Sequence, residues 1–267
     1  MRRAIVALVC ALLLGTSGAA LADSVLLGSD YLETIPPTFF DFGGPIGSVP
    51  LVGLPINPPL LGSTDTIVQR RADASLPAVG SSDTIPIELV QLSLVSASPV
   101  TIGTSFFDVF VHLTPSTSST GTATIRHEAP DDGGPAPEGT FDSFFDVFFT
   151  ADFTEVGNPF NTFSVVDQTQ LQALGTPWSH EPMLPGRLLV TGPAGDQNAN
   201  DHTARPPLFG DFHIQQVAEI KILGAPGQHT AIPAAPPHPG AIPGPGTLVL
   251  VSLGLPLALC IARRALA

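Results

Sequence analysis

Oxygen-bearing side chains recur at alternate positions in one short stretch of the chain. Asp196, Asn198 and Asn200 have the spacing of the first half of a calcium-binding loop. The stretch departs from that pattern at two points, because Asp201 replaces the required glycine and Pro207 replaces the bidentate glutamate. A calcium site and a polar loop without metal therefore both remain open.

Two further aspartates lie in nearly identical apolar surroundings. Asp108 and Asp146 each occupy the fourth position of the hexapeptide Ser-Phe-Phe-Asp-Val-Phe, which begins at Ser105 and again at Ser143. A carboxylate buried between phenylalanines needs a partner or a cation. The two could share a calcium ion or contact carbohydrate; alternatively, each lies at a sheet margin or caps a loop. Calcium is the only cofactor that these patterns suggest.

The remaining reactive residue types form no catalytic pattern. The seven histidines are scattered, and none has HExxH or other metal-ligand spacing. Cys10 and Cys260 lie in apolar terminal segments, so the region between them has no disulfide, thiolate zinc site or cysteine nucleophile. GxSxG, phosphate-loop and dinucleotide fingerprints do not occur. Trp178 lies in a proline-flanked stretch, either as a sugar-stacking platform or as a buried loop anchor.

Short strands separated by turns must position these side chains. The 26 glycines and 29 prolines indicate frequent turns, and the 16 phenylalanines argue against disorder. The clearest strand runs over residues 84–96, where Val90, Leu92 and Leu94 share one face. Further strands are predicted over residues 64–70, 103–113, 120–127, 140–156, 160–166, 187–191 and 209–223, with a short helix over 168–174. We expect a mainly β fold, an antiparallel β-sandwich with long Gly/Pro-rich loops.

The repeated hexapeptide indicates two equivalent strands in a duplicated or pseudo-symmetric sandwich. In the first copy, alternation places Phe106, Asp108 and Phe110 on one face of the strand. Phe107 and Val109 then lie on the opposite face. Both faces are apolar apart from the aspartate, so central strands are expected.

The first 22 residues have the layout of a secretory signal peptide. Two arginines precede an apolar run over residues 4–14, which is too short to span a membrane comfortably. Ala20 and Ala22 supply the small residues that signal peptidase reads, with cleavage expected before Asp23. An acidic, β-rich ectodomain is expected to follow over residues 23–230.

The last part of the chain changes character abruptly. Residues 231–246 form a proline-rich linker, which should be extended and fairly stiff. Residues 247–262 are mostly apolar and uncharged, and as a helix they would span about 24 Å. Arg263 and Arg264 then mark a cytoplasmic tail over residues 263–267. We expect a C-terminal membrane helix that leaves the ectodomain facing outward.

This three-part tail resembles the PEP-CTERM sorting signal, in which a Pro-Glu-Pro motif precedes a short membrane helix and a closing arginine cluster. Pro243, Gly244 and Pro245 match the motif, with glycine in place of glutamate, and Arg263 and Arg264 match the cluster. The resemblance implies recognition by an exosortase, a membrane peptidase. It also implies an association with biofilm or exopolysaccharide at the bacterial surface. A plain C-terminal anchor is the alternative.

The charge distribution narrows the classes of partner. All 23 acidic residues lie between Asp23 and Glu219, and the net charge of the whole chain is −13. Such a surface repels nucleic acid and favours solubility. The leading interpretation is a non-enzymatic surface or matrix protein of structural or adhesive type, associated with extracellular polysaccharide. A secreted hydrolase acting on glycans and a calcium-stabilised structural module are the alternatives.

Overall fold

The computed structural model describes residues 23–57, 61–130, 136–180, 212–214, 218–223 and 227–234. Within them the chain is mainly β and its strands pair antiparallel, which confirms the predicted fold class at that level. The signal peptide, the Asp196–Asp201 stretch, the sorting motif and the predicted membrane helix lie outside the described residues. Among the described residues, none forms a helix with the length and apolar character that crossing a membrane requires.

The described residues form fifteen strands. The first eight are β1 (Asp23–Val25), β2 (Gly28–Thr34), β3 (Phe39–Asp41), β4 (Ser48–Gly53), β5 (Thr66–Arg70), β6 (Ala74–Leu76), β7 (Ser82–Ser96) and β8 (Val100–Ile102). The others are β9 (Ser105–Leu113), β10 (Ser119–His127), β11 (Gly139–Glu155), β12 (Asn158–Ser179), β13 (His213–Ile214), β14 (Ala218–Leu223) and β15 (Gly227–Pro233).

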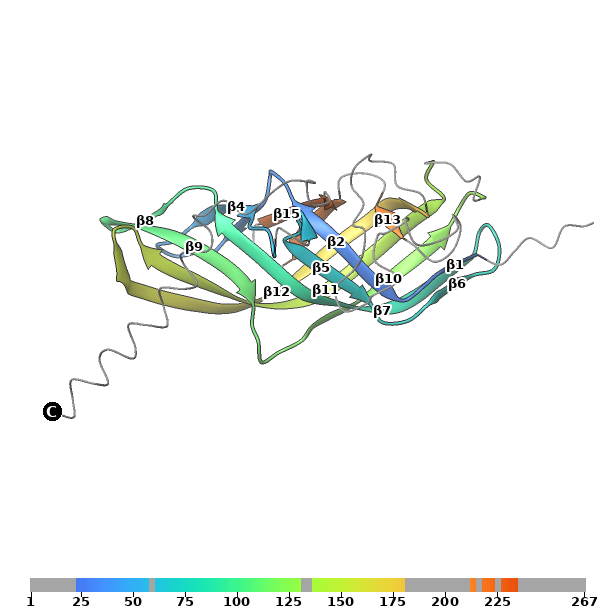
Figure 1. The fold of residues 1–267 in the computed structure, drawn as a ribbon, viewed down its shortest axis with the longest axis horizontal. Helices are drawn as coiled ribbons and strands as arrows, with labels where there is room; N and C mark the ends of the chain where they lie inside the picture. Colours follow the sequence, from blue (N-terminus) through green and yellow to red (C-terminus); the bar gives the residue numbers. More distant parts are fainter. Residues whose placement is uncertain are drawn as a thin grey trace, which may run out of the picture.

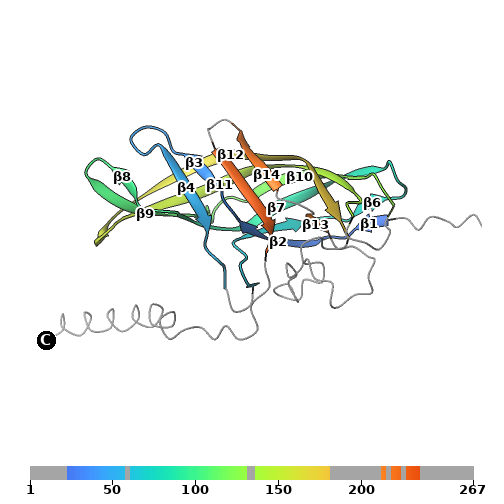
Figure 2. The same cartoon turned by 90° about the horizontal axis from the view of Figure 1, so that it is seen from above.

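Strand pairing closes into a ring. Its order is β11, β12, β14, β15, β2, β5, β7 and β10, and β10 pairs again with β11. The long strands β7 and β11 continue beyond β10, where β9 takes its place between them. On the other side, β3 and β4 replace β2 and β5 between β15 and β7. Figures 1 and 2 show β8 and β9 at one end of the elongated molecule and β1 and β6 at the other.

One apolar core fills the ring. Strand alternation buries every second side chain, as at Phe145, Val147 and Phe149 of β11. In β7 the alternation changes phase, because Val90 is an extra residue opposite the Ile67–Val68 step of β5. Leu92 and Leu94 therefore face the main core, while Val90 packs on the opposite face against a second cluster that contains Tyr31. The prediction that Val90 shares their face is wrong.

Strands lie where the sequence predicts them over residues 64–70, 84–96, 103–113, 120–127, 140–156 and 160–166, whereas the strand predicted over 187–191 lies outside the described residues. The linker predicted from residue 231 begins too early, because β15 continues to Pro233.

A second difference lies in β12. The segment 168–174, predicted as a helix, lies within β12, a strand of 22 residues. Its pairing with β11 extends from Asn158 to Trp178 and overrides the local helical preference. The turn of this hairpin is Val156–Gly157, and Gly157 has a φ of 84°, which favours glycine.

Candidate functional site

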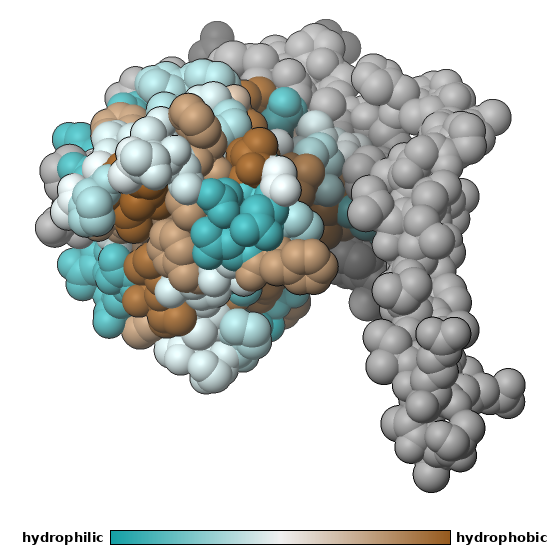
Figure 3. Space-filling view, turned by 90° about the vertical axis from the view of Figure 1, so that its left-hand side faces the viewer, coloured by the Kyte–Doolittle hydropathy of each residue, from teal (hydrophilic) through white to brown (hydrophobic). Residues whose placement is uncertain are grey.

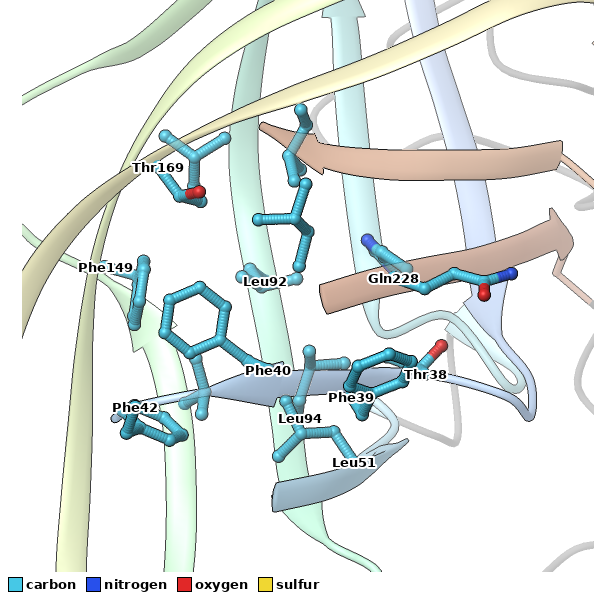
Figure 4. A pocket seen from close by; sticks show the side chains of 15 residues that line it. Thr38, Phe39, Phe40, Phe42, Leu51, Leu92, Leu94, Phe149, Thr169 and Gln228 are labelled. Carbon is cyan, nitrogen blue, oxygen red and sulfur yellow. The ribbon is translucent and has the colours of Figure 1, made fainter. Parts of the chain in front are cut away.

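An apolar cavity of about 50 Å³ lies inside the ring beside the β3–β4 hairpin. Its wall includes Phe39, Phe40 and Phe42 from β3 and the residue after it, together with Phe149 of β11. Figure 4 shows these rings on one side of the cavity and Leu92, Leu94 and Thr169 around it. The remaining wall is aliphatic apart from Thr38, Thr169, Gln228 and His229.

The aromatic part of the wall is a packed cluster. The rings of Phe40 and Phe149 meet edge to face with their centroids 5.1 Å apart, and Phe42 meets Phe153 in the same way at 5.5 Å. Edge-to-face pairs hold rings in defined positions and add about 1 kcal/mol each beyond the burial of area. The cavity is therefore bounded by side chains that are themselves held in place.

A buried polar cluster supports the opposite wall. The hydroxyl of Thr34 donates to Oδ1 of Asp65 at 2.7 Å, and the amide of Thr34 donates to Oδ2 at 2.7 Å. The hydroxyl of Thr66 donates to Oδ1 as well. A Cβ at Gly53 would overlap the Asp65 carboxylate, so only glycine leaves room for it at the end of β4. Asp65 thus accepts hydrogen bonds from β2 and β5 and packs against Gly53 of β4. It lies where the β3–β4 pair replaces the β2–β5 pair in the ring.

His229 joins this cluster to the cavity. Its Nε2 lies 2.9 Å from the Thr34 hydroxyl, whose single proton is already donated to Asp65. Nε2 must therefore carry the proton and donate to Thr34, which leaves Nδ1 as an acceptor. Burial lowers the pKa of His229 to about 4, so the ring is neutral at neutral pH. Burial also raises the pKa of Asp65, against its hydrogen bonds from Thr34 and Thr66.

Thr169 differs from the other polar residues of the cavity wall. Its side chain is only 8% exposed, and its hydroxyl has no hydrogen-bond partner among the described residues. By contrast, the hydroxyl of Thr38 donates to the carbonyl of Ile35, and the amide of Gln228 lies 3.3 Å from the Thr230 hydroxyl. Figure 4 shows Thr169 on β12, across the cavity from Phe39 and Leu51. An unpaired buried hydroxyl costs about 1–3 kcal/mol.

A second hollow, of about 60 Å³, lies inside the ring near the opposite end. Arg70 and Asp30 form a buried ion pair on its wall, and Nε of Arg70 donates to the carbonyl of Leu26 at 2.9 Å. The Arg70 guanidinium also lies over the ring of Phe212. Nearby, Glu138 accepts hydrogen bonds from the amide and Nδ1 of His180, and both residues are buried. Asp30, Arg70, Glu138 and His180 thus all have polar partners at this end.

The longest free strand edge described here belongs to β12. Residues 158–169 pair with β11 on one side, and β14 pairs with β12 only from Gln170 to Gln172. Within the described residues, the other edge of this segment has no strand beside it. Asp167 is its only charged residue, although the chain is strongly acidic. Free edges without charge are templates for pairing with another strand.

Apolar side chains are exposed at the same end of the molecule. Phe160 is 95% exposed, Val166 is 67% exposed and Phe106 is 57% exposed. Figure 3 views this end and shows apolar groups lying between polar ones. Phe163 is held more firmly, because its ring stacks on Phe153 with centroids 4.6 Å apart. The hairpin end therefore combines an open edge with apolar surface.

The two aspartates of the repeated hexapeptide do not come together. Asp108 lies opposite Thr154 in the β9–β11 pairing, whereas Asp146 lies eight residues away along β11. At about 3.3 Å per residue this places them about 26 Å apart. Asp108 is exposed, and Asp146 accepts a hydrogen bond from Gln170 at 2.9 Å. Neither lies buried between phenylalanines, so a calcium ion shared by both is geometrically impossible.

The equivalent orientation of the two copies is confirmed. Phe107 and Val109 face the core in β9, and Phe145 and Val147 face it in β11. Among the described residues, no three His, Cys, Asp or Glu side chains converge on a metal position. The calcium interpretation of Asp196, Asn198 and Asn200 stays a prediction, because these residues lie outside the described part.

Trp178 lies at the end of β12 rather than in a loop, and it is fully buried. Its Nε1 donates to the carbonyl of Arg126 at 3.0 Å, and its ring stacks on Phe212. It is an anchor of the core, so the sugar-stacking platform is wrong.

Sequence patterns did not reveal Thr34, Asp65, Thr169 or His229. Thr34 and His229 are 195 residues apart, and no motif links them. The only available signal was the run of phenylalanines around Phe40, which marks the aromatic wall.

Comparison with known proteins adds no relative: no protein family, no curated protein and no solved structure matches this chain.

Proposed function

We propose that this chain is an exported surface or matrix protein of structural, adhesive type, whose ectodomain associates with further copies through the free edge of β12. The observation that carries the proposal is the edge over residues 158–169, which is nearly uncharged and has no strand beside it in the part of the chain that the structure describes. Proteins that remain monomeric usually protect such edges with charge, bulges or a covering segment. Here Pro159, near the start of the strand, and the single charged residue Asp167 are the edge-protecting residues, and Val165 and Val166 favour pairing.

Pairing of two β12 edges has a simple geometry. Two antiparallel edges present the same surface to each other, so each copy offers the other an identical partner. The backbone groups of the edge supply affinity, and exposed side chains such as Val166 and Phe160 add apolar contact. Elsewhere the acidic surfaces of two copies repel each other, which favours contact at this uncharged strand.

The fold suits this role. We infer that the two sides of the ring pack face to face as the sheets of a β-sandwich, with one core between them. The shared apolar core, which includes Leu94 of β7 and Leu171 of β12, supports this arrangement. A rigid body of this kind would hold the free edge in an extended conformation before a partner arrives.

Delivery to the surface is part of the proposal. A signal peptide cleaved before Asp23 and a tail read by an exosortase would place the ectodomain outside the cell, and the resemblance of the tail links it to exopolysaccharide. Mass spectrometry of the protein from cells should find Asp23 as the first residue. Retention of the protein on exopolysaccharide from its own host would support the polysaccharide association, and failure to bind would refute it.

The test of edge pairing is a substitution that adds charge to the edge. Val166→Lys should lower self-association at least tenfold, because a charged side chain on the free edge of each copy disfavours strand pairing. Sedimentation velocity over a concentration series measures the effect.

Val79→Lys is the matched control, since Val79 is 50% exposed but lies outside β12. It should leave self-association unchanged. A wild-type protein that stays monomeric at every concentration would refute edge pairing, as would equal effects of the two substitutions.

A further inference from the structure

The apolar cavity is neutral throughout. Among the described residues, no Asp, Glu, Lys or Arg side chain contributes to its wall, and His229 is uncharged at neutral pH. A charged ligand would lose its hydration without gaining a partner there. A neutral, mainly apolar molecule loses nothing and gains contact with Phe40, Phe149 and the aliphatic wall.

Thr169 indicates what polar group such a molecule carries. Its hydroxyl is buried, faces the cavity and has no partner among the described residues. A threonine hydroxyl both donates and accepts one hydrogen bond, so it fits a hydroxyl or a carbonyl. Thr38 and Gln228 already have partners and do not compete for that group.

The position of the cavity gives a ligand a way in. From Thr169 back to Asn158, β12 pairs with β11 only within the described residues. We infer that a ligand enters on this side, where no strand pairing has to break. The volume of about 50 Å³ holds a few non-hydrogen atoms. A longer chain would extend outward along the free side of β12.

We propose that this cavity binds a neutral lipid-like molecule, an aliphatic chain with one hydroxyl or carbonyl group that pairs with Thr169. The site is separate from the edge pairing proposed above and does not depend on it. The aromatic cluster around Phe40 and Phe42 forms the floor for the chain. A bound ligand gives the Thr169 hydroxyl the hydrogen-bond partner that it lacks among the described residues.

A series of 1-alkanols from ethanol to 1-octanol tests the proposal on the purified protein. Shifts of the methyl resonances of Leu92, Leu94 and Val111 in nuclear magnetic resonance spectra report occupancy. Affinity should rise about fourfold per methylene for the first few carbons, and then level off as the chain leaves the cavity. The matching 1-chloroalkanes, which lack the hydroxyl, should bind about fivefold more weakly.

Thr169→Val keeps the side-chain shape and removes the hydroxyl, so it should abolish the preference for alcohols over chloroalkanes. Thr162→Val, at an exposed position of the same strand, is the control and should retain the preference. A melting curve checks that each variant is folded. Unshifted methyl resonances across the alkanol series, or an alcohol preference that survives Thr169→Val, would overturn the proposal.

Discussion

Two hollows of nearly equal size lie within one ring of strands, yet their polar side chains differ in whether they have partners. In the second hollow, Arg70 of β5 and Asp30 of β2 pair with each other and are both buried. In the cavity beside the β3–β4 hairpin, Thr169 has no partner among the described residues, and β12 is open next to it. The two hollows have similar volumes, and they differ in whether the polar side chains named here have hydrogen-bond partners.

The comparison shows where stability and function are to be sought. A buried polar group that is fully bonded stiffens the fold and leaves nothing to offer a ligand. A buried hydroxyl without a partner lowers stability and gains a hydrogen bond when a ligand arrives. Substitutions around the second hollow are therefore expected to lower the stability of the fold. Substitutions around the cavity beside the β3–β4 hairpin are expected to change ligand binding.

The largest effect is expected at the ion pair of the second hollow. Asp30→Ala removes the carboxylate from the buried Arg70 guanidinium and should lower the free energy of unfolding by about 4 kcal/mol. Glu88→Ala removes the partner of the exposed neighbour Arg71 and should lower it by less than about 1 kcal/mol. Urea denaturation measures both values. Equal losses would show that burial does not distinguish the two pairs.

The next effect is a dependence of stability on pH that comes from His229. Its pKa is about 4 when folded, below the ordinary value of 6.5, so acid favours the unfolded chain. This contribution is fully present above about pH 6.5, and about 3 kcal/mol is lost as the pH falls toward 4. Burial raises the pKa of Asp65, and the nearby Glu33 adds to the rise. Asp65 therefore contributes a pH dependence of opposite sign, because its protonation favours the folded chain as the pH falls.

His229→Gln isolates the histidine, because glutamine does not titrate. The difference in unfolding free energy between wild type and His229→Gln should shrink steadily from pH 7 to pH 4. A difference that does not change with pH would mean that the pKa of His229 is the same in the folded and the unfolded chain.

The smallest effect compares two threonines of similar burial. Thr34→Val removes hydrogen bonds to Asp65 and His229 and should lower the free energy of unfolding by about 2 kcal/mol. Thr169→Val removes a hydroxyl that has no partner among the described residues and should leave stability equal or slightly higher. Thermal and urea denaturation at neutral pH measure both. A loss at Thr169→Val as large as at Thr34→Val would show that the hydroxyl of Thr169 is as well bonded as that of Thr34.

Local patterns predicted the strands well because alternation and turn residues act over a few neighbours. The placement of Phe107 and Val109 on one face of their strand follows from the period alone, whereas the structure decided that this face lies inward. Val90 shows the limit of this reasoning, since its bulge depends on the register with β5. The helix predicted over residues 168–174 failed for the same reason, because pairing with β11 outweighs local preference.

By itself, the sequence determined the class of fold, the uneven charge and the equivalence of the two hexapeptides, all of which depend on residue type and short spacing. Only the tertiary structure decided that Asp108 and Asp146 lie apart, that Trp178 is buried, and that Thr34, Asp65 and His229 meet. It also decided that the edge of β12 beside Thr169 is open among the described residues. Ring closure brings distant strands together, and which side chains then meet depends on the register of every strand between them.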